Sequence, residues 1–164
     1  MLLTSCGKKT IPDGASAVKP FDVSRYVGKW YEIARLDFKQ ERGLNNTSAE
    51  YSLNNNGTIK VLNRGYNVEK QKWEEAEGKA KFVDDSNEAR LKVSFFGPFY
   101  SGYNVVAIDP NYRYALIMGE DLKYLWLLSR ETTMPEEVKR EYLEKAKAIG
   151  YKTEDLVWVE HNKK

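Results

Sequence analysis

The chain has 164 residues, a length that suits one domain with a hydrophobic core of its own. Its 26 basic and 24 acidic residues leave a net charge of +2, which excludes the strong positive field of a nucleic-acid-binding protein. Aromatic residues make up 13% of the sequence, and this enrichment favours β-structure.

The first 20 residues differ from the rest of the chain. The stretch Leu3–Gly7 resembles the lipobox of bacterial lipoproteins, in which the cysteine is lipidated and becomes the mature N-terminus. The polar residues behind it are typical of a flexible tether. Only five residues precede Cys6, too few for a charged region and a full apolar region, so we expect most of a signal peptide to be missing. The alternative for a lone cysteine is a small buried hydrophobe.

This interpretation predicts how the protein is organised and where it resides. Residues 1–20 are expected to be a lipobox remnant and tether, and residues 21–164 a single domain. Gly7 follows the cysteine, whereas the usual inner-membrane retention signal at that position is Asp. We therefore expect a lipid anchor at Cys6 in the outer membrane, on its periplasmic face.

From Gly28 onward the sequence predicts short strands at regular spacing, separated by turn signals such as Asn54–Gly57 and Asp84–Asn87. The eight expected strands are Lys29–Leu36, Thr47–Leu53, Thr58–Val68, Lys72–Val83, Ala89–Phe95, Tyr103–Ile108, Tyr114–Met118 and Tyr124–Ser129. Hairpin-length links between them indicate an up-and-down meander, and a sheet of this size tends to close on itself and so remove its edges. An eight-stranded barrel has room for side chains or for one small ligand.

One helix is expected after these strands. Thr133–Glu136 has the spacing of a capping box with Pro in the first turn, apolar residues then recur at helical spacing, and Gly150 ends the helix. A last short strand is expected at Leu156–Glu160. The predicted fold is therefore all-β, an eight-stranded antiparallel up-and-down barrel with one C-terminal helix packed outside.

Two motifs resemble those of a known family. Gly28–Tyr31 matches the G-x-W-Y signature of the lipocalins, and Trp126–Arg130 reads W-x-x-S-R on the eighth strand, just before a helix. The run from Tyr26 to Glu160 resembles the bacterial lipocalins, the outer-membrane lipoprotein branch close to apolipoprotein D. The family's second motif, usually T-D-Y, departs here to Ile108–Pro110, which leaves the role of Asp109 less defined.

The resemblance implies structural roles for the signature residues. Trp30 is expected to plug the closed end of the barrel, and Gly28 lets the chain pass close beneath it. Arg130 is expected to stack over the indole and to donate to nearby backbone carbonyls, which makes these residues structural and not catalytic.

The resemblance also places the upper pocket at Tyr51, Asn63, Phe95 and Trp126. Strand alternation from Trp30 predicts that Glu32 and Ala34 face inward as well. Choosing the apolar face of the remaining strands adds further inward positions. With these, the candidate ligand-binding set consists of Tyr51, Asn63, Phe95, Trp126, Val61, Phe82 and Ala34.

The small inward residues Ala76, Gly78 and Ala80 are expected to leave volume for a ligand. The alternative is that the inward side chains simply fill a core, and we prefer this for Leu91 and Val93.

The resemblance implies a carrier that holds a small lipophilic molecule, a fatty acid such as palmitate or a lysophospholipid. A barrel that needs no ligand and serves as a structural or interaction protein is the alternative. Some lipocalins are enzymes, one of them through a cysteine inside the barrel, but the only cysteine here lies in the tether and His161 is expected in a solvated tail. Glu32 has no partner base, so no enzyme is predicted. We expect the protein to bind no metal, no cofactor and no nucleic acid.

The stretch Phe95–Tyr103 holds five aromatic residues in nine positions. Its loop should lie at the open rim of the barrel. Its rings are expected to cover neighbouring strand ends, to touch a membrane, or to form a self-association patch that makes a homodimer, and the sequence leaves these three open.

Overall fold

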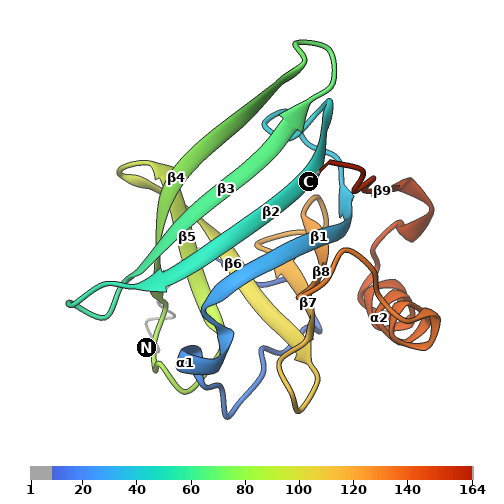
Figure 1. Ribbon diagram of the computed structural model, residues 1–164. Helices are drawn as coiled ribbons and strands as arrows, with labels where there is room; N and C mark the ends of the chain where they lie inside the picture. Colours follow the sequence, from blue (N-terminus) through green and yellow to red (C-terminus); the bar gives the residue numbers. More distant parts are fainter. Residues whose placement is uncertain (1–8, 164) are drawn as a thin grey trace.

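The computed structural model describes residues 9–163, which fold into one closed antiparallel sheet with a helix outside it (Figure 1). The strands are β1 (Gly28–Leu36), β2 (Leu44–Leu53), β3 (Ile59–Asn67), β4 (Lys72–Phe82), β5 (Arg90–Phe96), β6 (Phe99–Ile108), β7 (Tyr114–Gly119), β8 (Leu125–Ser129) and β9 (Leu156–Trp158). The helical segments are α1 (Val23–Tyr26), α2 (Glu136–Ile149) and a short 3₁₀ turn, η1 (Thr153–Asp155).

The barrel closes because β1 pairs with β8 on one side and with β2 on the other. The lower half of β1 pairs with β2, whereas its last residues pair with β9, which adds a short strand outside the barrel proper. The eight expected barrel strands are all present. The sixth begins at Phe99, four residues before its expected start at Tyr103, because Phe96 and Phe99 pair across the β5–β6 turn.

Alternation along the strands divides the apolar residues between two clusters. The cluster inside the barrel includes Trp30, Tyr51, Val61, Leu91, Ile117 and Leu128. The second cluster joins the outer faces of β7 and β8 to α2 through Leu116, Met118, Leu127, Tyr142 and Ala146. The helix therefore covers one outer side of the barrel and leaves its interior free (Figure 1).

The start of α2 differs from the prediction. Pro135 is the N-cap and no side chain caps the helix, so the expected capping box does not form. In the preceding turn, the Ser129 hydroxyl donates a hydrogen bond of 2.8 Å to the carbonyl of Thr133. The end of α2 is as predicted, because Gly150 has a φ of 118° and donates to the carbonyls of Ala146 and Lys147.

The described part of the N-terminal segment is packed on the barrel, unlike the flexible tether that the sequence predicts for it. The amide of Val18 donates to the carbonyl of Val105, and the carbonyl of Val18 accepts from Ala89. Ala17 and Val18 also pack against the inner cluster, close to the base. Cys6 lies outside the described residues.

Candidate functional site

The closed end of the barrel is built around Trp30, which is fully buried. Its indole nitrogen donates to the carbonyl of Tyr26 at 2.8 Å, and the guanidinium of Arg130 lies 3.8 Å from the centre of its ring. Arg130 also donates to five backbone carbonyls, at 2.8–3.1 Å, those of Arg25, Tyr26, Val27, Lys29 and Tyr112. Gly28 has a φ of 102°, and a Cβ atom there would come within 3.3 Å of Arg130, so a side chain at this position would be strained.

Asp109 holds the turn that follows β6 at the same end. Its carboxylate accepts from the amides of Asn111, Arg113 and Tyr114 at 2.7–3.1 Å. This turn places the carbonyl of Tyr112 where Arg130 can donate to it. Asp109 is therefore a turn residue that helps to fix the base of the barrel.

Above Trp30, three tyrosine hydroxyls meet inside the barrel. The hydroxyls of Tyr51 and Tyr103 lie 2.7 Å apart, and the hydroxyl of Tyr26 is also hydrogen-bonded to that of Tyr103. Burial raises the pKa of all three hydroxyls well above the usual tyrosine value, so they are neutral donors and acceptors. They form a hydrogen-bonded floor within an otherwise aromatic interior. Of the three, only Tyr51 is among the binding residues predicted from the sequence; Tyr26 and Tyr103 are not.

Six of the seven candidate binding residues lie on inner faces of strands: Tyr51, Val61, Asn63, Phe82, Phe95 and Trp126. Val61 is buried in the core, and Phe82 lies low in the barrel, 6.4 Å from Phe21 between ring centres. Asn63 and Trp126 are only partly buried and lie nearer the open end. Above the tyrosine hydroxyls, the inner wall thus changes from apolar to partly polar at the mouth.

Ala34 is not on the inner wall, so the prediction that it faces inward is wrong. The pairing of β1 with β8 shifts between Glu32 and Ala34, and this bulge reverses the alternation. Ala34 packs in the outer cluster beneath α2, and Arg35 takes its place beside Trp126.

The inner face of β4 leaves less space than its small residues suggested. The ring of Phe95 lies over Gly78, where a Cβ atom would come within 2.7 Å of it. Ala80 is buried, whereas Ala76, on the same face toward the open end, is exposed. The inner-face residues of β3 and β4 that solvent reaches are therefore those above Phe95, such as Ala76 and Asn63.

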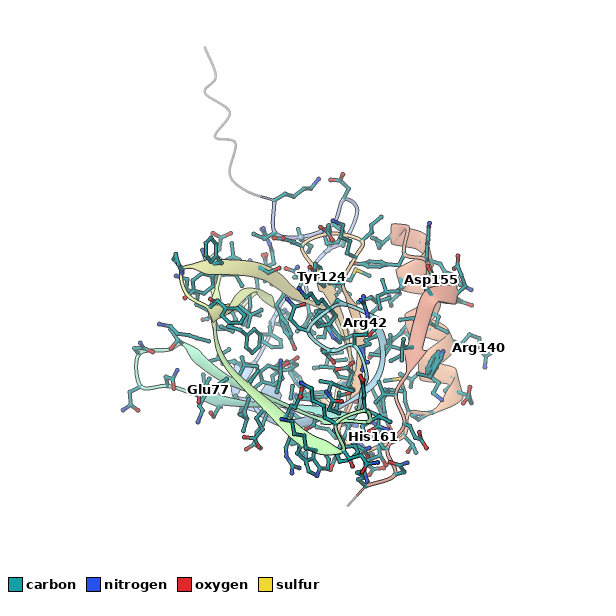
Figure 2. All side chains as sticks on the ribbon, turned by 90° about the horizontal axis from the view of Figure 1, so that it is seen from above. Arg42, Glu77, Tyr124, Arg140, Asp155 and His161 are labelled. Carbon is teal, nitrogen blue, oxygen red and sulfur yellow. The ribbon has the colours of Figure 1, made fainter. Side chains whose placement is uncertain are left out.

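A buried charged cluster ties the β1–β2 loop to the mouth. Arg35, only 2% exposed, lies 3.3 Å from Glu32 and 3.6 Å from Glu41, and donates to the carbonyls of Glu41 and Leu44. The indole nitrogen of Trp126 donates to Glu41 at 3.2 Å. Figure 2 is seen from above Figure 1 and looks onto this end, where Arg42 of the same loop and Tyr124 lie toward the middle of the view.

Burial and the nearby Glu41 carboxylate raise the pKa of Glu32 well above its usual value, and Arg35 only partly offsets this. The C-terminal tail supports the cluster from outside, because His161 is hydrogen-bonded at 2.7 Å to the carbonyl of Glu32. His161 thus lies in the C-terminal tail, as expected, but it is partly buried against β1 and not fully solvated.

Other features of the described chain lie away from the interior. Two surface hollows of ≈ 440 and ≈ 450 Å³ are lined by α2 with Trp158 and by residues around Leu36 and Leu122, and neither reaches the inner wall. Within residues 9–163, no three His, Cys, Asp or Glu side chains gather to hold a metal ion. No helix in that range is both long and apolar enough to cross a membrane.

Comparison with known proteins identifies the family. A model of the lipocalin-like domain matches residues 21–161 of this sequence. The chain belongs to the lipocalin family. It is 49% identical over 158 residues to the outer membrane lipoprotein Blc of Citrobacter freundii, covering 96% of this chain and 89% of that protein. The Blc lipoprotein of Vibrio cholerae is 47% identical, with 98% and 93% covered.

More distant lipocalins share the fold. Apolipoprotein D of Rattus norvegicus is 36% identical over 71% of this chain and 65% of its own length. The solved structure of insecticyanin from the tobacco hornworm superposes with a TM-score of 0.75 at 20% identity, covering 96% of this chain and 91% of that one. The eight-stranded barrel with its external helix is therefore a lipocalin calyx.

Proposed function

We propose that this lipocalin is a carrier that binds one fatty acid or lysophospholipid in its calyx. Its anchoring and address are part of the proposal: a lipid on Cys6 holds it at the periplasmic face of the outer membrane. The names of its bacterial relatives, outer membrane lipoproteins, support the anchoring. Its membership of the lipocalin family, together with its Blc relatives, supports a carrier and not an enzyme.

The observation that carries the proposal is the polarity of the inner wall. Aromatic and aliphatic side chains line it above the tyrosine floor, and hydrogen-bonding groups appear only toward the mouth, at Asn63, Trp126 and the Arg35 cluster. A molecule with one apolar chain and one polar end matches this gradient, because unpaired polar groups on an apolar wall cost about 1–3 kcal/mol each. The ring of Trp126, stacked on Tyr124 and near Phe38, lies beside the path that such a chain would follow.

Saturation binding of a fluorescent fatty acid to refolded, delipidated protein tests the proposal. We expect one site per chain, and displacement of the probe by lysophospholipid. Ala76→Trp should abolish binding, because the new ring enters the upper calyx. Glu77→Trp, one residue along and facing outward, is the matched control and should bind normally. Absence of binding to the folded wild type would favour a barrel that needs no ligand.

A further inference from the structure

The turn between β5 and β6 exposes two large apolar rings. Phe96 is 75% exposed and Phe99 is 78% exposed, the highest values among the large hydrophobic residues that the structure describes. Gly97 and Pro98 lie between them and are exposed too. We refer to Phe96–Phe99 as the lip; it projects at the left of Figure 1, beside β4. Exposed rings of this size indicate a surface that is covered by something else.

The lip lies at the open end of the barrel. Strand β1 leads away from the Trp30 base, so antiparallel pairing brings the end of β5 and the start of β6 to the mouth. The neighbouring β7–β8 loop at the same end contributes Leu122, which is 45% exposed. Whatever covers the lip therefore lies in front of the mouth.

Two lysines stand behind the lip on the outer wall. Lys81 and Lys92 pair directly across β4 and β5, and their amino groups lie 4.5 and 5.6 Å from the centre of the Tyr100 ring. Neither takes part in an ion pair with another described residue. Two unneutralised positive charges side by side favour a negatively charged partner.

The N-terminal segment arrives at the same level of the wall. The carbonyl of Thr10 accepts from Asn104 at 2.8 Å and packs on Gly102, where a Cβ atom would come within 2.1 Å of it. Gly102 is also the pairing partner of Lys92. Phe99 is three strand residues from Gly102, or about 10 Å, while Cys6 is four residues from Thr10 and can reach about 14 Å. A lipid on Cys6 and the rings of the lip can therefore occupy the same leaflet.

We propose that the lip inserts into the membrane leaflet to which Cys6 is anchored, with Lys81 and Lys92 at the anionic headgroups and the calyx mouth facing the bilayer. The orientation rests on the anchoring proposed above. Phenyl rings enter the boundary between headgroups and acyl chains, about 5–10 Å deep, and lysines near that boundary each attract anionic lipid. The lipid on Cys6 and the apolar lip then bind the membrane together, at two separate points of the chain. With the mouth facing the bilayer, a ligand can pass between bilayer and calyx without crossing water.

A membrane fits this surface better than a second copy of the chain. A second copy of the chain would bring to the contact the same two positive side chains, Lys81 and Lys92, and no complementary negative charge. Anionic headgroups complement the same charges. Lipid is therefore the partner that we assign to the lip. The experiment below also detects self-association through the lip.

The test uses the full chain with Cys6→Ser, so that no acyl anchor contributes. Binding is measured by co-sedimentation with vesicles of phosphatidylethanolamine and phosphatidylglycerol in a 3:1 ratio. Phe96→Ser with Phe99→Ser should lower the partition coefficient at least tenfold. Val157→Ser with Trp158→Ser, which removes two exposed apolar residues from β9, is the matched control and should change it less than twofold. Lys81→Gln with Lys92→Gln should weaken binding only to vesicles that contain phosphatidylglycerol.

Three results would overturn the proposal: absence of vesicle binding by the parent chain, equal losses in the lip and control variants, or a lip substitution that alters only the sedimentation of the free protein. The last would assign the lip to a dimer. Fatty-acid binding in solution without vesicles should be unchanged in the lip variant, so loss of calyx binding and loss of membrane binding remain distinguishable.

Discussion

Truncation of Trp30 tests the role of the base. Trp30→Ala removes a fully buried indole, and buried Trp truncations cost about 3–5 kcal/mol. The stacked Arg130 guanidinium adds about 0.5–2 kcal/mol, because it loses its aromatic partner. The lost indole hydrogen bond adds little, since the Tyr26 carbonyl still accepts from Arg130 at 3.1 Å. We therefore expect a loss near the upper end, about 4–5 kcal/mol in the free energy of unfolding.

Urea unfolding followed by circular dichroism measures this loss. The matched control is Trp158→Ala, because Trp158 is 47% exposed and its removal should cost less than about 1 kcal/mol. Ligand affinity should fall in the Trp30 variant only as far as the protein unfolds. A loss below about 2 kcal/mol with an unchanged denaturant slope would refute the plug assignment. So would a variant of near wild-type stability that no longer binds ligand.

Three further predictions concern the calyx and the anchor. Trp126→Ala should weaken fatty-acid binding about tenfold, or 1.4 kcal/mol, and should cost less stability than Trp30→Ala. An unchanged affinity, together with an unchanged fluorescence difference spectrum on ligand addition, would contradict this prediction. Because the pKa of Glu32 is raised on folding, its contribution to the free energy of unfolding is full below about pH 4.3 and falls as pH rises toward the folded-state pKa. Glu32→Gln should therefore gain stability relative to wild type with rising pH in urea titrations, and parallel pH curves would show the sign to be wrong. With an intact upstream signal sequence, Cys6→Ser should release the protein from the membrane fraction, and retention there would argue against lipidation.

The strands and the signature motif were predictable because alternation and turn residues specify them locally. The β8 alternation from Arg130 correctly placed Trp126 on the inner wall, since no bulge interrupts that strand. On β1, by contrast, one bulge reversed the alternation and moved Ala34 outside and Arg35 inside. The sequence I-A-R-L gives no sign of it, because apolar residues there fit either face.

Contacts between distant segments were also beyond sequence reasoning. Tyr26 and Tyr103 come from α1 and β6, and their hydroxyls meet only once the barrel has closed. Glu41 belongs to a loop whose path over the mouth depends on Arg35.

Mass spectrometry of the protein, purified from its native source without delipidation, tests the carrier proposal most directly. We expect one amphiphile with a single acyl chain per barrel, retained in Glu77→Trp and lost in Ala76→Trp. A wild-type barrel that carries no lipid, or equal lipid in the inward and outward tryptophan variants, would contradict a calyx that holds its ligand above Phe95.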